Sequence, residues 1–461
     1  TFANKFALGG DQTWQTTANG SGLVFNGVVA LSGFNLTLNL ASSGSAVVEF
    51  NANLTGTGSS LTLAGNGTML LGGNANYTGT TTIDNGATLQ VAGGGFASSA
   101  AVVVNSGGTL DLNGFGDTIS SVAGAGSLKL GSATLVLNGT DSTNFSGTIS
   151  GTGGIDRRGT GTLTLSGDND FSGGVIINAG TIELGSDTGL GSGTLDLSGG
   201  TLSASADRTI ANDLVMSGAS QVNGNAGVDF VFTSDNITPN AGSMTVTNLT
   251  GSGPAVSVGF TGSGGAFNFN RGITLNDDTE LRFLNTSGTQ TFSGSISGTG
   301  DVVRDAAGGT TFLDSNNSFT GSLILRGGTV QIAQENRLGA TPGAPTADRV
   351  IFDGGELSTT ATFSINSDRG FRFDAGGGTL SPDAGTTLTY DGIATGTGGL
   401  TMGGAGTLVL GGDNTFSGGT VIGMGTLQAE TDTALGTGTV DLAGGTLSAG
   451  ADRTFANNLT L

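Results

Sequence analysis

The chain has 461 residues, contains neither cysteine nor histidine, and carries 14 Lys and Arg against 35 Asp and Glu, a formal net charge of −21. This composition excludes a disulfide framework, a Cys- or His-based zinc site and a Cys or His nucleophile. Nucleic acid is not an expected partner, because binding phosphates needs clustered cations and Lys5 and Lys129 are the only lysines. No run of 18 apolar residues occurs, so we expect no membrane insertion by this segment.

In chain order, the first 64 residues are the least regular, and an internal repeat becomes clear within residues 65–112. The opening residues 1–8, TFANKFAL, resemble residues 209–216, TIANDLVM, and residues 454–461, TFANNLTL. The chain thus opens and closes at the same phase of the repeat. We therefore expect the 461 residues to be a window of a longer array.

The strongest repeat occupies residues 159–216 and returns at residues 404–461. From residue 161 to residue 216, 35 of 56 positions are identical to their counterparts, without insertion or deletion. Such self-similarity is typical of stacked repeat architectures. The repeat-defining pairs are Gly161 and Gly406, Phe171 and Phe416, and Asp207 and Asp452, and Tyr77 and Phe319 hold the aromatic place in the other units.

Within this unit, short runs alternate polar and apolar residues and are bounded by glycine, which predicts half-buried strands of about four residues. No segment between the runs is long enough, or helically periodic enough, to be a crossover helix. We therefore predict an all-β fold: a parallel β-helix with roughly 20 coils, taking about 20 to 25 residues for each coil, in one continuous β-solenoid over residues 1–461. The predicted strands are Thr162 to Leu165, Thr181 to Leu184, Thr194 to Leu197 and Thr201 to Ala204.

Residues 217–290 depart most from the repeat and form an irregular insert region, and a variant repeat follows at residues 308–357. Residues 336–349, NRLGATPGAPTADR, contain two of the five prolines and predict a protruding loop, because proline cannot donate to a strand ladder. A second phrase marks the coils: FSGTISGTG at residues 145–153 recurs as FSGSISGTG at 292–300 and loosely as YDGIATGTG at 390–398.

The pattern Gly-x-Gly-Thr-Leu-x-Leu, then Asn-x-Phe/Tyr-Ser/Thr-Gly, then Gly-Thr-Leu and Gly-Gly-x-Leu resembles the autotransporter-associated β-strand repeat of bacterial secreted proteins. The resemblance implies a right-handed parallel β-helix passenger, exported across a Gram-negative-type envelope and displayed or released outside. That family includes adhesins, surface-fibre proteins and a minority of enzymes. The extracellular or cell-surface location is thus an expectation drawn from the resemblance.

The first functional hypothesis is a non-enzymatic structural protein without a cofactor, which forms or belongs to a surface filament. Head-to-tail self-association of coils would build it, because open solenoid ends expose unpaired strand edges. The alternative is an adhesin that binds glycans or cell-surface proteins through residues 336–349 and 217–290. A third hypothesis, an enzyme acting on polysaccharide, requires Asp and Arg clustered on one sheet.

Three sets of residues are candidates for chemistry. Oxygen ligands in Asp168-Asn169-Asp170 and Asp413-Asn414 fit Ca²⁺, but we favour Asx turns, in which these side chains bond their own backbone, and no metal site. For the aromatics Tyr77, Phe171, Phe319 and Phe416 we favour core packing over a carbohydrate-binding stripe. Five Asp-Arg pairs predict corner or surface positions with weak ion pairs: Asp156-Arg157, Asp207-Arg208, Asp348-Arg349, Asp368-Arg369 and Asp452-Arg453.

Overall fold

In the computed structural model, parallel strands are stacked as a β-solenoid of about 20 turns. The structure describes residues 1–16, 22–40, 46–98, 100–234, 237–239, 243–249, 255–261 and 267–461. The chain forms two compact units, Thr1–Val222 and Asn223–Leu461, and the boundary falls within β29 (Ser220–Gly224). Parts of the insert region 217–290, namely residues 235–236, 240–242, 250–254 and 262–266, lie outside the described residues.

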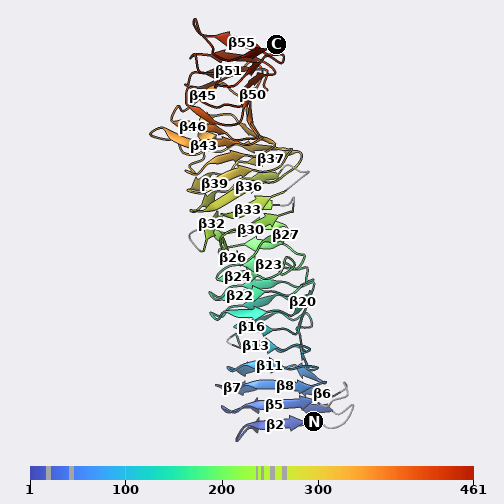
Figure 1. Cartoon of the computed structure of the whole chain (residues 1–461). Coiled ribbons are helices and arrows are strands. Elements are labelled where there is room, and N and C mark those ends of the chain that lie inside the picture. Colours follow the sequence, from blue (N-terminus) through green and yellow to red (C-terminus); the bar gives the residue numbers. More distant parts are fainter. Residues whose placement is uncertain are drawn as a thin grey trace. The chain divides into compact units, whose positions relative to one another are not determined.

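In the first unit, each short strand pairs with the strand of the same sheet in the next coil, so the coils are stacked on one another (Figure 1). One sheet contains β1 (Phe6–Ala7), β4 (Val29–Ala30), β7 (Leu54–Gly56) and β10 (Ala75–Tyr77). The longest row runs through β2 (Gln12–Gln15), β5 (Leu36–Leu40), β8 (Leu61–Gly65), β11 (Thr81–Ile83), β13 (Ala101–Val104), β16 (Ser121–Gly124), β19 (Thr143–Phe145), β22 (Thr162–Leu165), β24 (Thr181–Leu184) and β26 (Thr201–Ala204).

Two further rows complete the coils of this unit. The first contains β3 (Gly22–Phe25), β6 (Val47–Phe50), β9 (Thr68–Leu71), β12 (Thr88–Val91), β14 (Thr109–Asp111), β17 (Ser127–Gly131) and β20 (Thr148–Gly151). The second contains β15 (Asp117–Ile119), β18 (Leu135–Leu137), β21 (Ile155–Arg157), β23 (Val175–Ile177), β25 (Leu195–Leu197) and β28 (Leu214–Met216), and β27 (Arg208–Ile210) precedes β28 in the chain.

The second unit repeats this arrangement. We call one sheet the charged sheet. It contains β30 (Asp229–Phe232), β33 (Val256–Phe260), β36 (Thr279–Phe283), β39 (Asp301–Arg304), β41 (Leu323–Leu325), β43 (Thr346–Phe352), β46 (Arg369–Phe373) and β49 (Ala394–Gly396). A second contains β34 (Phe267–Phe269), β37 (Thr289–Phe292), β40 (Thr310–Leu313), β42 (Thr329–Ile332), β44 (Glu356–Thr359), β47 (Gly378–Pro382), β50 (Leu400–Met402), β52 (Thr420–Ile422), β54 (Val440–Asp441) and β56 (Leu459–Thr460).

The remaining strands of the second unit form shorter rows. They are β32 (Met244–Asn248), β35 (Ile273–Leu275) and β38 (Ile296–Gly298) in one row, and β45 (Phe363–Ile365), β48 (Thr387–Tyr390), β51 (Thr407–Leu410), β53 (Thr426–Ala429) and β55 (Thr446–Ala449) in another. The segment β31 (Ile237–Pro239) stands between β30 and β32 in the chain. Within the described ranges the only helical element is the 3-10 turn η1 (Glu335–Arg337).

The core follows from the alternation in the sequence. In β22, Leu163 and Leu165 are buried while the intervening threonines are half-buried. Leu163 pairs with Ile182 of β24, and Ile182 pairs in turn with Leu202 of β26. Parallel in-register pairing therefore places one apolar side chain above the next from coil to coil, and this stacked column forms the interior of the solenoid.

Candidate functional site

The four repeat-defining aromatics Tyr77, Phe171, Phe319 and Phe416 are fully buried in the core. One coil after Phe416 the chain passes over its ring at Gly436, where a Cβ atom would lie 2.7 Å from the ring and φ is +69°. Only glycine fits this approach and this backbone conformation without strain. The backbone N–H of Thr437 then donates to the carbonyl of Phe416 at 2.9 Å. The aromatic and the later glycine thus form one packing unit.

The asparagine two residues before each phenylalanine connects three consecutive coils. The Oδ1 of Asn414 accepts the backbone N–H of Ala394 at 2.8 Å, and its Nδ2 donates to the carbonyl of Ala434 at 2.7 Å. Asn169 and Asn317 make the same two bonds in their own coils. The prediction of plain Asx turns is wrong, because these amides bond backbone 20 or 21 residues away rather than their own.

The aspartates of these turns also reach the next coil. The carboxylate of Asp168 accepts hydrogen bonds from the hydroxyls of Ser186 at 2.7 Å and Thr188 at 2.8 Å, which lower the pKa of Asp168. Asp413 accepts the hydroxyl of Thr433 in the same way. In the described ranges, no three His, Cys, Asp or Glu side chains are grouped so that they could hold a metal ion.

The remaining repeat-defining residues divide between the interior and the surface. Gly161 and Gly406 are buried where a Cβ would lie 2.2 Å and 2.3 Å from a carbonyl oxygen of the preceding coil. Asp207 and Asp452 are exposed, and each precedes an arginine that lies 4.0 Å from a carboxylate of the previous coil. For these two Asp-Arg pairs, the surface positions predicted from sequence agree with the structure.

For the arginines of the other three Asp-Arg pairs, a surface position is wrong. The side chains of Arg157, Arg349 and Arg369 are buried, and Arg157 is only 2% exposed. Each guanidinium donates to backbone carbonyls of neighbouring coils; Arg157, for example, reaches Leu137 at 3.2 Å and Gly139 at 3.1 Å. Carbonyl oxygens at a coil corner need donors, and a long arginine side chain can supply several at once.

Arg304 is buried at the position equivalent to Arg157 in another copy of the repeated phrase. It lies twelve residues after Phe292, as Arg157 does after Phe145, and it donates to the carbonyls of Phe283 at 2.7 Å and Asn285 at 2.6 Å. Burial lowers the pKa of Arg304 to about 10, so it stays protonated at neutral pH. The third copy of the phrase places Met402, also buried, at this position. An apolar residue in the aligned copy is a sequence signal that this position faces the core.

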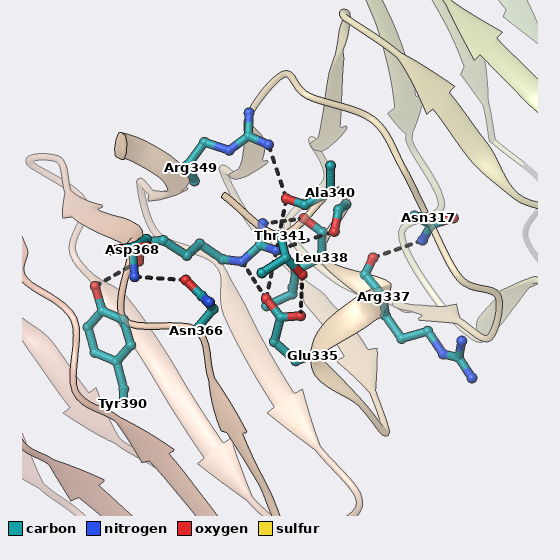
Figure 2. Close-up of polar contacts among 12 residues, drawn as sticks. Asn317, Glu335, Arg337, Leu338, Ala340, Thr341, Arg349, Asn366, Asp368 and Tyr390 are labelled. Carbon is teal, nitrogen blue, oxygen red and sulfur yellow. Dashed lines mark hydrogen bonds and ion pairs between the residues drawn. The ribbon is translucent and has the colours of Figure 1, made fainter. Parts of the chain in front are cut away.

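The predicted loop 336–349 is fastened to the second unit by two arginines. Arg369 is fully buried, and its guanidinium donates to Glu335 Oε1 at 2.7 Å and to the carbonyl of Leu338 at 2.7 Å. Arg349 donates to the carbonyl of Ala340 at 3.4 Å, and Figure 2 shows Glu335, Leu338 and Ala340 gathered around these contacts. The loop begins with η1, and β43 already begins at Thr346. Between η1 and β43, residues 341–345 are exposed except for the half-buried Pro342.

Replacing Glu335 by glutamine is expected to loosen this loop. The neutral amide would leave the buried guanidinium of Arg369 without its counter-ion, although the carbonyl contacts remain, so we expect a local loss of about 1–2 kcal/mol. Hydrogen exchange followed by mass spectrometry should show faster exchange in peptides covering residues 336–349. A matched variant, Glu356→Gln, removes a half-buried carboxylate of β44 and should leave those peptides unchanged; equal exchange in the two variants would contradict the role given to Glu335.

A groove with a volume of about 460 Å³ opens beside this loop, and we name it the Asp391 groove. Its walls come from the start of β43, the start of β46 and the turn before β49, and include Pro345, Ala347, Asp368, Phe371, Asp391 and Ile393. Ile393 is 52% exposed. Tyr390 supports this wall: its hydroxyl accepts the N–H of Phe371 at 3.0 Å and lies 2.9 Å from the carbonyl of Ile393. Burial raises the pKa of Tyr390, so the hydroxyl keeps its proton.

The charged sheet of the second unit does bring Asp and Arg together. Arg282 bridges Asp229, at 3.0 Å, and Asp305. Arg372 bridges Asp348 at 2.7 Å and Asp374 at 2.8 Å. The clustering that the enzyme hypothesis required is therefore present, and the absence of a cluster cannot be used against that hypothesis.

The chemistry of these arginines does not fit a general base. Burial alone would lower the pKa of Arg282, but its hydrogen bond to Asp305 and the charge of Asp229 outweigh burial and raise it. The hydrogen bond to Asp374, with Asp348 close by, raises the pKa of Arg372. A general base must be able to lose its proton near the working pH. Both arginines hold their protons more firmly than a free arginine, so their arrangement fits ion-paired scaffolding.

Two carboxylates lie next to each other on the same sheet, because Glu280 pairs in register with Asp301. Burial raises the pKa of both groups. A raised carboxyl pKa means that the folded state binds the proton more tightly than the unfolded state. The stability contributed by Glu280 is therefore complete below its unfolded pKa of about 4.3 and is lost as pH rises through the folded pKa.

Replacing Glu280 by glutamine tests this pH dependence. Because glutamine does not titrate, we expect Glu280→Gln to match the wild type at about pH 4 and to be more stable by a few tenths of a kcal/mol at about pH 7. Thermal unfolding followed by circular dichroism at the two pH values measures the difference. A variant that is unchanged at about pH 4 and less stable than the wild type at about pH 7 would show that attraction to Arg326 and Arg282 outweighs the burial of Glu280.

Comparison with known proteins identifies the repeat. No solved structure matches the chain. The family described as the passenger-associated-transport-repeat matches residues 61–91, 157–184, 308–332 and 400–429, and each match contains one of the four buried aromatics. These four stretches of the chain therefore match the passenger-associated-transport repeat. The resemblance drawn from the sequence is confirmed.

One similar protein extends the comparison beyond the four matches. The chain is 32% identical over 387 residues, 79% of its length, to the protein "Adhesin BmaC autotransporter" of Brucella suis biovar 1 (strain 1330). It spans about 9% of that protein's length. In the part of the chain that the structure describes, no helix is both long and apolar enough to cross a lipid bilayer.

Proposed function

We propose that the chain is a section of a non-enzymatic, adhesin-type passenger on the outside of a Gram-negative bacterial cell, where it binds a surface partner. The observation that carries this proposal is the 32% identity to a protein named as an adhesin autotransporter, over most of this chain. The passenger-associated-transport repeats support an exported, surface location. The small share of the relative that is covered supports a further proposal, that residues 1–461 are one part of a longer array of such coils.

The binding face of this passenger is proposed to be the Asp391 groove with the exposed loop residues 341–345. These residues stand out from the repeating coils, and loops on a rigid scaffold are where binding residues concentrate. Arg369 and Arg349 hold the base of the loop through its backbone carbonyls. A loop fixed in this way loses little conformational freedom on binding, which favours affinity.

An adhesion assay tests the proposed function. Antibodies against residues 1–461 should label intact cells that express the parent protein, and beads coated with the purified chain should adhere to cultured epithelial cells or to neighbouring bacteria. Excess soluble chain should block the beads, because both compete for the same partner. Coated beads that adhere no better than albumin-coated beads to every surface would overturn the proposal.

The filament hypothesis is retained as a second proposal. Its support is the uniform parallel pairing of the coils, for example β42 with β44 and β44 with β47, which is the pairing that two stacked copies would use. Self-association would then depend on concentration and yield particles of increasing length. Sedimentation velocity and electron microscopy of the purified chain would reveal them, and a species that stays monomeric at high concentration would count against it.

A further inference from the structure

The residues around the Asp391 groove depart from the internal repeat. The phrase at residues 390–398 aligns with residues 145–153 and 292–300. At the position of Asp391 the other copies have Ser146 and Ser293, and at the position of Ile393 they have Thr148 and Ser295. Thr148 and Ser295 are exposed, as Ile393 is. One copy has therefore replaced two small polar residues by an acid and an exposed apolar side chain, both in the wall of a groove.

The aromatic residue of this copy differs as well. Tyr390 occupies the place of Phe145 and Phe292, and its hydroxyl lies within hydrogen-bond distance of the carbonyl of Ile393. The hydroxyl has one proton to donate, and the carbonyls of Ile393, in the turn that carries this side chain, and of Arg369 both lie in reach. Three departures from the repeat, Tyr390, Asp391 and Ile393, thus fall within four residues and act on one surface feature. The folding of a coil does not require them, because the two other copies fold without them.

The charges of the groove are of one sign. Asp368 and Asp391 contribute carboxylates to the lining, and the lining contains no lysine or arginine. Neither carboxylate has a hydrogen-bond or ion-pair partner among the residues that the structure describes, unlike Asp348 and Asp374 on the same sheet, which pair with Arg372. Pro345, Ala347 and Ile393 supply apolar surface between them. The groove therefore offers two unneutralised anions on an apolar floor, which is complementary to a cation carried on an apolar stem.

We infer that the Asp391 groove binds a lysine- or arginine-bearing peptide segment of a partner protein, with an apolar residue beside the cation. The inference rests on the proposed function and names the class of partner at the same face. The cationic head would pair with Asp391 and Asp368, and the neighbouring apolar side chain would cover Ile393 and Pro345. A volume of about 460 Å³ fits a few side chains of an extended segment rather than a folded domain.

A glycan fits this lining less well. Sugar rings pack on exposed aromatic faces, but Phe371, the one aromatic residue of the lining, is buried and stacked on Tyr390 with ring centroids 4.0 Å apart. An anionic ligand would meet two carboxylates and a chain of net charge −21. A cationic peptide is thus favoured by both the charge and the shape of the lining.

The test measures binding of a fluorescein-labelled hexapeptide, Gly-Leu-Lys-Val-Lys-Gly, to the whole chain by fluorescence anisotropy. The variant Asp391→Ser with Ile393→Thr restores the residues of the other copies, so its fold should be kept. We expect the variant to bind on the order of tenfold more weakly, because a charge-assisted contact and an apolar contact are both lost. Raising the salt concentration should weaken binding by the wild type.

Asp383→Ser is the matched control, because Asp383 is an exposed acid of the same unit outside the groove. Equal weakening by Asp383→Ser would show non-specific attraction to an acidic chain and overturn the inference, as would equal binding of the counterpart Gly-Leu-Glu-Val-Glu-Gly. Binding of a neutral oligosaccharide such as chitotetraose, lost in the double variant, would assign the groove to glycans instead. If the bead adhesion described above persists in the double variant, the groove inference fails while the adhesin proposal stands.

Discussion

Replacing Arg304 by alanine is expected to lower the local stability of the second unit by about 3–5 kcal/mol. The change leaves the buried carbonyls of Phe283, Asn285 and Gly308 without their donor and opens a cavity where the side chain lay. Unsatisfied buried polar groups are costly because they have lost water without gaining a partner. We expect the effect in the coils that contain β36, β39 and β40.

The companion variant Arg304→Met separates the two causes. Methionine occupies the equivalent position at Met402, so it should fill the space and lose about half as much stability as alanine. Hydrogen exchange measured by mass spectrometry on peptides from these strands gives local free energies, which suits a repeat protein that need not unfold in one step. Slow, unchanged exchange in Arg304→Ala would mean that water replaces the guanidinium at little cost.

Replacing Asn414 by alanine is expected to cost about 2–4 kcal/mol, because the N–H of Ala394 and the carbonyl of Ala434 both lose a buried partner. Asn414→Asp keeps the acceptor but places a negative oxygen against that carbonyl, so it should be destabilising as well. The effect should appear in the coils on both sides of the asparagine.

Asp413→Ala serves as the control for Asn414. Asp413 is exposed and accepts one hydroxyl, from Thr433, so its loss should change stability by no more than about 0.5 kcal/mol. Exchange rates of the peptides around residues 394 and 434 should rise in Asn414→Ala and not in Asp413→Ala. If the two variants behave alike, the asparagine does not connect the coils in the way described.

Much of the fold could be predicted from alternation and glycine alone. The strand Thr162–Leu165 occurs at the residues where the sequence predicts it, because leucines at every second position leave one arrangement that buries them. Phe171 and Phe416 recur at a fixed phase with the strands, which already indicates packing. The neighbouring prediction for Thr194 to Leu197 is one residue too long, since β25 begins at Leu195.

The buried arginines could not be predicted, for a physical reason. A charged side chain beside an aspartate usually lies in solvent, and local sequence does not reveal that Arg157 reaches carbonyls twenty residues back. The same limit applies to Asn169, whose partners belong to the coils before and after it. Comparing aligned copies, in which Met402 replaces the arginine, carries that information.

The ion pairs of the charged sheet could not be predicted from the sequence. Asp229 and Arg282 are separated by two coils of unequal length, and they meet at 3.0 Å only because the strands between them stack in register. Predicting this contact requires the length of every intervening turn. The Asp391 groove depends in the same way on the register between β43, β46 and β49.

The most direct measurement for the central claim, that a surface passenger binds through the face around residues 341–345 and the groove, is bead adhesion by a chain with that face replaced. Residues 341–345 would be exchanged for Gly-Ser-Gly-Ser-Gly, together with Asp391→Ser and Ile393→Thr. We predict that adhesion falls to the level of albumin-coated beads while exchange protection of β44, β47 and β51 is unchanged. Full adhesion by this variant would contradict the claim and place the binding face elsewhere on the chain.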